Sequence, residues 1–356
     1  MTEPSLSRRA ALRSLLGTAA ALTASGTLSR EEKLLANHLA ETPLPGDAPA
    51  AFVENTPTTQ TEVDATSGAT RTTFTLPQRE ALNEPVPMSH IGNVKISRLI
   101  LGGNLLTGFV HSRDLIYVGE LARRYNTKNK VYETLLLAEE CGVNTFLAYP
   151  GVLDMFADYR KWTGGEIQYI CDSRSPEQVQ KSVDGGAVAC YINGERTDDL
   201  VARNEFDYLA SCMETTHKNG LPFGFGAHRI VTLEKLAERG LIPDFWMKTY
   251  HSDAYWSARH ESEHDNIFCR EPERTSAFFA GRTEPWIAFK VCAAGAIPPE
   301  LGLRFAFEGG ADFVCLGMYD FQLVENVNRC VEILRDLPKR TRNWMTKTLD
   351  ENLEET

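Results

Sequence analysis

The sequence lacks a long apolar run, a CxxC pair and a surplus of basic residues. Without an apolar run of bilayer length, we expect no stable membrane span. The eight cysteines show no metal-type spacing, so neither a structural zinc site nor a disulfide scaffold is expected. A net charge of −11 argues against a general nucleic-acid binder, which needs basic surface. These absences favour a globular protein whose partner is a small molecule, and they leave its oligomeric state open.

The N-terminal residues indicate a targeting segment. Arg8 and Arg9 precede a mildly apolar stretch, residues 15–24, that is rich in Ala, Leu and Thr. A twin arginine before a weakly hydrophobic region resembles a twin-arginine (Tat) export signal, although Ala10 stands near where that signal usually has an aromatic residue. An amphipathic basic helix is the alternative. We predict a signal over residues 1–29, export of the folded protein, and a periplasmic or extracellular location.

Residues 30–87 are predicted to form an irregular arm. Pro43, Pro45, Pro49 and Pro57 interrupt regular structure, and a Thr-rich stretch follows them up to residue 75. The pattern becomes regular only near Val94. At the other end, residues 338–356 are expected to form a C-terminal tail.

Between the arm and the tail, short apolar runs alternate with helix-like segments. Eight such units over about 240 residues predict an α/β fold, a (β/α)8 TIM barrel over residues 88–337, with a doubly wound open sheet as the alternative. The expected strands are Ile96–Gly102, Asn144–Ala148, Ile167–Cys171, Ala187–Ile192, Pro222–Gly226, Phe245–Thr249, Trp286–Val291 and Asp312–Leu316, and the expected helices include Lys130–Cys141, Glu177–Val183, Thr197–Asn219, Val231–Arg239, Pro299–Glu308 and Val324–Leu337.

Two segments at strand ends indicate where a site lies, because barrel chemistry gathers at the carboxyl ends of the strands. Lys290 ends a buried strand and precedes a small-residue turn, although a lysine there can also extend to solvent. The loop from Tyr250 to Pro272 is too long for a simple connection. His251 and Asp253 in this loop, with the acidic and histidine residues of 260–265, form a candidate divalent-metal site, and a solvated loop is the alternative.

Several motifs, taken in order, resemble the aldo/keto reductases over about residues 88–335. The hairpin-like opening with its first strand and the later strands carry this resemblance, at residues 91–103, 142–146, 224–228, 243–247, 287–295 and 317–327. The resemblance implies a TIM barrel and an oxidoreductase with NADP or NAD as cofactor. It also implies cofactor contacts from Phe289, Ala294, Gly295, Gln322 and Asn326.

The family's catalytic set is absent at the matching positions. The resemblance places Leu147 at the aspartate position, Val152 near the tyrosine, Asp172 near the lysine and Asn193 near the histidine. In the nicotinamide pocket, His228 replaces an asparagine, Met247 a glutamine and Lys290 a serine. We therefore do not expect carbonyl reduction by the family's usual mechanism.

The polar residues that remain at the strand ends suggest another chemistry. His228 is the candidate acid or base, because imidazole titrates near neutral pH, with helix capping as the structural alternative. Lys290 is a candidate carbonyl clamp or Schiff-base nucleophile, since an amine held in an apolar strand has a lowered pKa. Asp172 and Asn193 would position the substrate. Lys248 ranks below Lys290, because strand alternation points it outward if Met247 faces the lumen.

The leading hypothesis is an exported, aldo/keto reductase-like barrel enzyme of altered active site. It would act on a small polar carbonyl or sugar-derived substrate by acid/base chemistry, in keeping with a role in carbohydrate metabolism. A redox enzyme with bound nicotinamide, a lyase or aldolase acting through Lys290, and a non-catalytic small-molecule binding protein are the alternatives.

Overall fold

The computed structural model describes Phe74 and residues 76–113, 115–255, 257–258, 266–337 and 339–346. The predicted signal at 1–29 and the arm up to residue 73 lie outside the described residues, as do residues 259–265 of the long loop. The rest of the arm, residues 76–87, follows the barrel surface, where the Val86 amide donates to the Cys141 carbonyl.

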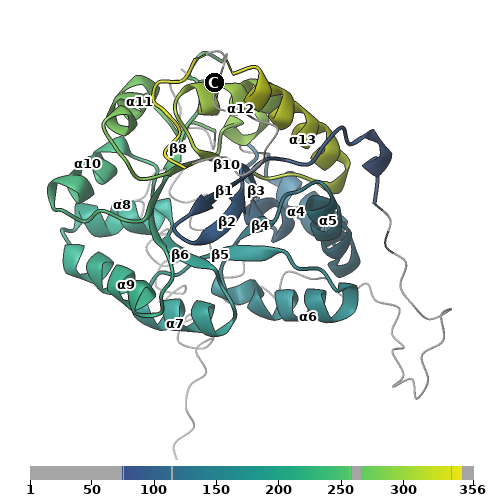
Figure 1. The fold of residues 1–356 in the computed structure, drawn as a ribbon, viewed down its shortest axis with the longest axis horizontal. Helices are drawn as coiled ribbons and strands as arrows, with labels where there is room; N and C mark the ends of the chain where they lie inside the picture. Colours follow the sequence, from purple (N-terminus) through teal and green to yellow (C-terminus); the bar gives the residue numbers. More distant parts are fainter. Residues whose placement is uncertain are drawn as a thin grey trace, which may run out of the picture. The chain divides into compact units, whose positions relative to one another are not determined.

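Eight parallel strands close into a barrel (Figure 1). Each strand is hydrogen-bonded to its neighbours in the chain, and the last strand pairs with the first. The TIM-barrel prediction is confirmed. The barrel strands are β3 (Leu99–Leu101), β4 (Thr145–Ala148), β5 (Gln168–Asp172), β6 (Ala189–Ile192), β7 (Phe223–Ala227), β8 (Phe245–Thr249), β9 (Trp286–Phe289) and β10 (Phe313–Leu316).

Helices surround the strands, and local capping chemistry sets several of their starts. Ser175 accepts a hydrogen bond from the Gln178 amide, with Pro176 at the first helical position. The helices are α3 (Gly103–Leu106), α4 (Tyr117–Tyr125), α5 (Lys128–Glu140), α6 (Leu153–Thr163), α7 (Pro176–Asp184), α8 (Gly194–Ala202), α9 (Phe206–Lys218), α10 (Ile230–Glu238), α11 (Pro272–Ala280), α12 (Pro299–Glu308) and α13 (Asp320–Arg335); the 3-10 turns are η2 (Arg79–Ala81), η3 (Pro150–Val152) and η4 (Ala293–Gly295).

One expected helix is wrong. The segment Thr197–Asn219 is split into α8 and α9, because Asn204 adopts a left-handed conformation with φ of 59°. Asparagine tolerates this backbone region better than most residues do.

Successive strand residues alternate between two cores. On β8, Phe245 and Met247 join the cluster inside the barrel, whereas Trp246 joins the larger cluster between strands and helices. Met247 therefore faces the lumen. Lys248 consequently leaves the strand on its outer side.

The amino-terminal end of the barrel is closed by a hairpin of β1 (Met88–Ile91) and β2 (Val94–Ser97). Ile91 and Ile96 are fully buried and join the cluster inside the barrel. The single strand expected at Ile96–Gly102 is therefore two strands, one in the hairpin and one in the barrel, with Arg98 between them.

Residues 339–346, which belong to the predicted tail, pack against the same end of the barrel. Arg342 is buried, and its side chain donates to the carbonyls of Gly310 and Glu284 and to the carboxylate of Asp312. All eight cysteines are free thiols. Among the helices that the structure describes, none has both the length and the apolar character needed to cross a membrane.

Candidate functional site

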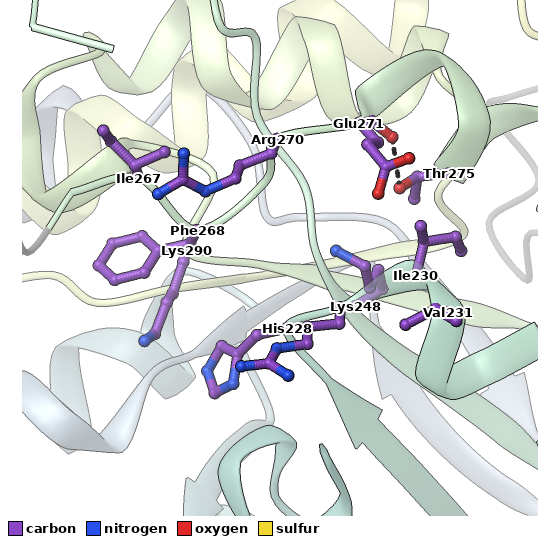
Figure 2. A pocket seen from close by; sticks show the side chains of 11 residues that line it. His228, Ile230, Val231, Lys248, Ile267, Phe268, Arg270, Glu271, Thr275 and Lys290 are labelled. Atoms are coloured by element: carbon purple, nitrogen blue, oxygen red, sulfur yellow. Dashed lines mark hydrogen bonds between the residues drawn. The ribbon is translucent and has the colours of Figure 1, made fainter. Parts of the chain in front are cut away.

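A cavity of about 540 Å³ lies at the carboxyl ends of β7, β8 and β9, beside the starts of α10 and α11 (Figure 2). It is displaced from the barrel axis toward these helices, so residues on the outer side of the strands reach it. The described residues that line it are His228, Arg229, Ile230, Val231, Lys248, Ile267, Phe268, Arg270, Glu271, Thr275 and Lys290.

The lining of the cavity is strongly cationic. Arg229, Arg270 and Lys290 contribute positive charge, Lys248 adds an amine, and Glu271 supplies the only carboxylate among its described lining residues. The whole chain carries a net charge of −11, so this concentration of cations runs against the protein's overall charge. A cavity of this kind favours a ligand with an anionic group, because cations in a partly desolvated site attract anions strongly.

His228 follows β7 and is fixed by Asp198, which lies on α8. The imidazole Nδ1 lies 3.2 Å from Asp198 Oδ2, and the same oxygen accepts from the His228 amide at 3.0 Å. Asp198 Oδ1 accepts from the Thr232 hydroxyl at 2.6 Å. The imidazole is thus held by a carboxylate that is itself anchored, the arrangement that orients catalytic histidines.

Lys290 lies directly after β9, in a backbone conformation that disfavours a side chain. Its φ is 56°, and Ala293 and Ala294 also have positive φ values, of 45° and 52°. Such residues store strain of about 1–2 kcal/mol each, and strained residues often occur at functional sites. The Lys290 Nζ lies 3.9 Å from the centre of the Phe268 ring, and Figure 2 shows the side chain extending toward His228.

Lys248 lines the same cavity although it points out of the barrel. Its side chain is 1% exposed, and Nζ donates to the Thr249 carbonyl at 2.7 Å and to Thr249 Oγ1 at 2.9 Å. Burial lowers the pKa of the Lys248 amine. The expectation that Lys248 leaves the strand outward is met, but this direction leads into the cavity because the cavity is off the barrel axis.

Asp172 and Asn193 form a pair at the ends of β5 and β6. The Asp172 carboxylate accepts from the Asn193 amide and side chain, both at 3.0 Å, and from Arg174 Nε at 2.9 Å. Burial raises the pKa of Asp172, and Arg174 opposes that shift. The Asn193 side chain also caps α8. Neither residue lines the cavity, but a Cβ on the next residue, Gly194, would lie 2.9 Å from the His228 ring. The pair therefore supports the backbone against which His228 packs.

His251 joins the start of the long loop to its end through hydrogen bonds. Its Nδ1 lies 2.8 Å from the Ser252 carbonyl, and its Nε2 accepts from the amides of Phe268 and Cys269 at 3.1 and 3.0 Å. Burial lowers the pKa of this imidazole, which agrees with a neutral ring. Both ring nitrogens are thus occupied, so His251 has no lone pair to offer a metal ion in this structure.

The other candidate metal ligands do not form a site in the part of the chain described. No group of three or more His, Cys, Asp or Glu side chains there could hold a metal ion. Asp253 lies in the same loop, two residues after His251, and residues 260–265 lie outside the described range.

The five residues expected to contact a nicotinamide cofactor lie along one side of the barrel mouth. Phe289 ends β9, and its ring lies 5.9 Å from that of His228. Ala294 and Gly295 belong to η4, in left-handed conformations, and Asn326 is buried on α13. Gln322 caps the start of α13, where its Oε1 accepts from the Tyr319 amide at 3.2 Å. Nicotinamide contact by these residues stays a prediction.

The start of α13 does not fit a cofactor phosphate. A helix N-terminus attracts anions, but here the buried carboxylate of Asp320 already occupies that position. Asp320 accepts from the Tyr125 hydroxyl at 2.6 Å and from Lys130 Nζ at 3.0 Å. A phosphate there would meet a carboxylate, so the start of α13 is not a site for the phosphate of a nicotinamide cofactor.

The structure adds site residues that the sequence did not indicate. Asp198 lies within α8, with no motif around it, and only the fold brings it to His228. Arg229, Phe268, Arg270 and Glu271 belong to segments of ordinary composition. The one usable signal was the length of the loop after β8, which contributes Phe268, Arg270 and Glu271 to the cavity.

Comparisons with known proteins reveal likeness in fold. No protein-family model matches the chain, and no curated protein matches it. A solved structure assigned as an aldo-keto reductase from Pseudomonas aeruginosa is 15% identical with a TM-score of 0.49, over 70% of this chain and 94% of that one. A truncated 3-deoxy-D-arabino-heptulosonate 7-phosphate synthase from Thermotoga maritima is 13% identical with a TM-score of 0.45, over 74% and 97%. A glycerol dehydrogenase from Gluconobacter oxydans is 10% identical with a TM-score of 0.45, over 68% and 90%.

Proposed function

We propose that this chain is a barrel enzyme that transforms a small polar carbonyl compound, sugar-derived and bearing an anionic group, by acid/base chemistry. The observation that carries the proposal is the His228 imidazole in the wall of a cationic cavity, held by the Asp198 carboxylate. A histidine fixed in this way has the geometry of a general acid or base.

Each polar residue of the cavity has a separate role in this reaction. With Nδ1 engaged by Asp198, Nε2 is the ring nitrogen that exchanges a proton with the carbon next to the carbonyl. Removal of that proton places negative charge on the carbonyl oxygen. Lys290 stabilises this charge, since a preorganised cation in a partly desolvated site lowers the energy of a developing oxyanion. Arg229 and Arg270, which line the same cavity, bind the anionic group of the substrate.

Solvent exchange measures the proton-transfer step alone, whatever the later steps of the reaction. Dihydroxyacetone phosphate, glyceraldehyde 3-phosphate and their unphosphorylated forms are each incubated with the protein in D₂O, and loss of the C–H signal is followed by NMR. We expect faster exchange for the phosphorylated compounds. No exchange above the protein-free rate for any compound would contradict the acid/base role.

A second histidine–aspartate pair supplies a matched control. His217 Nε2 lies 2.7 Å from Asp244 Oδ2, but both side chains are more than 40% exposed and lie outside the cavity. Asp198→Asn should slow exchange about 100-fold, because the imidazole loses its orienting charge. Asp244→Asn should leave the exchange rate unchanged. Equal behaviour of the two variants would remove Asp198 from the mechanism.

If the protein binds the phosphorylated compounds but exchanges none of them, it is a small-molecule binding protein instead. Isothermal titration with dihydroxyacetone phosphate separates these outcomes. A fluorescence titration with NADPH checks the redox alternative in the same preparation, and saturable binding there would support the nicotinamide contacts predicted above.

Export through the twin-arginine route is part of this proposal, and its support is the sequence around Arg8 and Arg9. In a bacterial host with that route, the wild-type chain should reach the periplasm or medium. Replacing both arginines with lysine should retain it in the cytoplasm, as measured by fractionation and immunoblotting. Equal distribution of the two forms would contradict export by this route.

A further inference from the structure

We propose that Lys248 is a covalent catalytic residue whose amine forms an imine with the carbonyl carbon of the substrate. The inference rests on the proposed function, because it requires a carbonyl compound in the same cavity. It also differs from the expectation drawn from the sequence, in which Lys290 was the imine-forming lysine and Lys248 ranked below it.

The first support is the position of Lys248. Its side chain is 1% exposed, yet it is one of the residues that line the cavity. In Figure 2 its amine is directed from β8 toward the space among the labelled residues. A group so placed is shielded from bulk solvent and remains accessible to a ligand inside the cavity.

The second support is the set of partners around the amine. Its two hydrogen-bond acceptors are neutral oxygens, the carbonyl and hydroxyl of Thr249. The Thr249 hydroxyl lies 2.5 Å from the Phe268 carbonyl, to which it donates, so its lone pair faces Lys248. No carboxylate of the described residues forms an ion pair with Lys248. A buried amine without a carboxylate partner is more readily deprotonated, and only the neutral amine is nucleophilic.

Lys290 has surroundings of the opposite kind. Its ammonium lies over the face of Phe268 at 3.9 Å, and a ring face stabilises a cation. Its side chain is only partly buried. These surroundings suit a charged group that stabilises an oxyanion, so the two lysines have different roles in one cavity.

The covalent step balances without an added oxidant or reductant. The neutral amine of Lys248 attacks the carbonyl carbon, a C–N bond forms, and the π electrons of the C=O bond move to oxygen. His228, in the same cavity wall, transfers the protons that convert the resulting hydroxyl into a leaving water. Overall, one neutral amine, one carbonyl and one proton delivered through His228 give one protonated imine and one water. The imine then withdraws electrons from the adjacent C–H bond, which aids the proton transfer proposed above.

Chemical trapping tests this assignment. The full-length folded protein is incubated with a substoichiometric amount of pyridoxal 5′-phosphate, an aldehyde with a phosphate group, and then reduced with borohydride. Peptide mass mapping locates the label. We expect Lys248 to carry at least about tenfold more label than exposed Lys235, because its amine lines the cavity and burial lowers its pKa. The preference should disappear when the labelling is done in urea.

Variants sharpen the result. Lys248→Met should remove the preferred label, Lys290→Met should keep it on Lys248, and inorganic phosphate should compete with the probe. Labelling of Lys290 instead, or labelling that simply follows exposure in the folded wild type, would overturn the assignment. Comparing the labelling of Lys248 in wild type with and without urea tests the assignment even if Lys248→Met fails to fold.

A negative result in the trapping experiment is independent of a negative result in the exchange experiment. If Lys248 is trapped but no compound exchanges protons, the imine site stands and the proposed acid/base function fails. If exchange proceeds at the wild-type rate in Lys248→Met, the proposed function stands and the imine step is contradicted.

Discussion

Cationic side chains cluster at both ends of the barrel, but the partners of these side chains differ between the two ends. At the amino-terminal end, Arg98, Arg340 and Arg342 surround the buried Asp312. At the carboxyl-terminal end, Arg229, Arg270, Lys290 and the amine of Lys248 line a cavity whose described lining residues include one carboxylate, that of Glu271. The first cluster is closed by its own acceptors, whereas the second faces a cavity.

In the amino-terminal cluster, each arginine side chain donates to several hydrogen-bond acceptors. Arg342 donates to four backbone carbonyls and to Asp312, and Arg340 donates to carbonyls of residues 307, 310, 311 and 342. Arg98 donates to the Asp312 carbonyl and to Thr346, and it stacks at 4.0 Å over Trp344. Burial lowers the pKa values of these guanidinium groups, but their many acceptors compensate for the lost water.

The carboxyl-terminal cluster is organised for a different purpose. Lys248 is buried on neutral acceptors, and Lys290 adopts a strained backbone conformation. Natural proteins tolerate such costs mainly where function requires them. Changes at the amino-terminal end are therefore expected to alter stability, whereas changes at the carboxyl-terminal end are expected to alter proton exchange and ligand binding.

The largest effect is expected at the amino-terminal end. Asp312→Ala leaves buried arginines without their carboxylate and removes the acceptor of the Trp286 and Met345 amides. We expect a loss of about 3–5 kcal/mol in the free energy of unfolding, measured with urea. Exposed Asp336→Ala is the control and should change little. A loss below about 1 kcal/mol would show that the arginine cluster is not a major source of stability.

Gly194→Ala should slow proton exchange at the carboxyl-terminal end of the barrel. A Cβ there would lie 2.9 Å from the His228 ring and 3.1 Å from the Ala227 backbone, so the imidazole must move. We expect the exchange rate per folded molecule to fall about 100-fold, because small displacements of a catalytic group are costly. Gly119→Ala, where the new Cβ meets only ordinary contact, is the matched control. An unchanged rate in Gly194→Ala would argue against His228 as the proton-transfer group.

Lys290→Gly should weaken ligand binding without lowering the free energy of unfolding. Glycine relieves the left-handed strain, so unfolding should cost the same or about 1 kcal/mol more, while dihydroxyacetone phosphate binds less tightly. Asn204→Gly replaces another left-handed residue, far from the cavity in sequence, and should leave binding unchanged. Clear destabilisation of Lys290→Gly would mean that the lysine is kept for the fold.

The smallest effect is expected from His251 as pH falls. Burial lowers the folded-state pKa below the ordinary value of 6.5; the hydrogen bond to Ser252 and the charge of Asp253 oppose this shift, and Lys248 and Lys290 add to it. The unfolded chain therefore binds the proton more readily, so the stability contributed by His251 is present above pH 6.5 and is lost as pH falls through the folded pKa.

Urea unfolding of wild type and His251→Leu at pH 8 and pH 5 measures this contribution. The difference between the two proteins should shrink at pH 5, and ligand binding should weaken there too, since His251 holds the Phe268 amide beside the cavity. A difference that stays constant with pH would contradict the anchoring role.

The barrel could be predicted because its strands are short buried runs whose spacing repeats along the chain. All eight expected strands correspond to observed ones, with the first divided by Arg98. The segment Thr197–Asn219 was misjudged because one left-handed asparagine interrupts an otherwise helical composition. Residues 339–346 looked like a tail because their role depends on Asp312, which only the fold places beside them.

The candidate site was predicted in part. His228 and Lys290 stand at strand ends, and the closed barrel brings them to one cavity. Asp198 and the outward route of Lys248 depend on where the cavity lies relative to the barrel axis, which residue spacing does not encode. His251 was predicted to be a metal ligand, but whether its nitrogens serve a metal or the backbone depends on the loop conformation.

We propose that proton transfer at the carboxyl-terminal end of the barrel runs through His228. Exchange of dihydroxyacetone phosphate protons in D₂O, measured per folded molecule, compares His228→Asn with His217→Asn. We predict a loss of at least about 100-fold in His228→Asn and wild-type exchange in His217→Asn. Equal exchange rates in the two variants would contradict the claim.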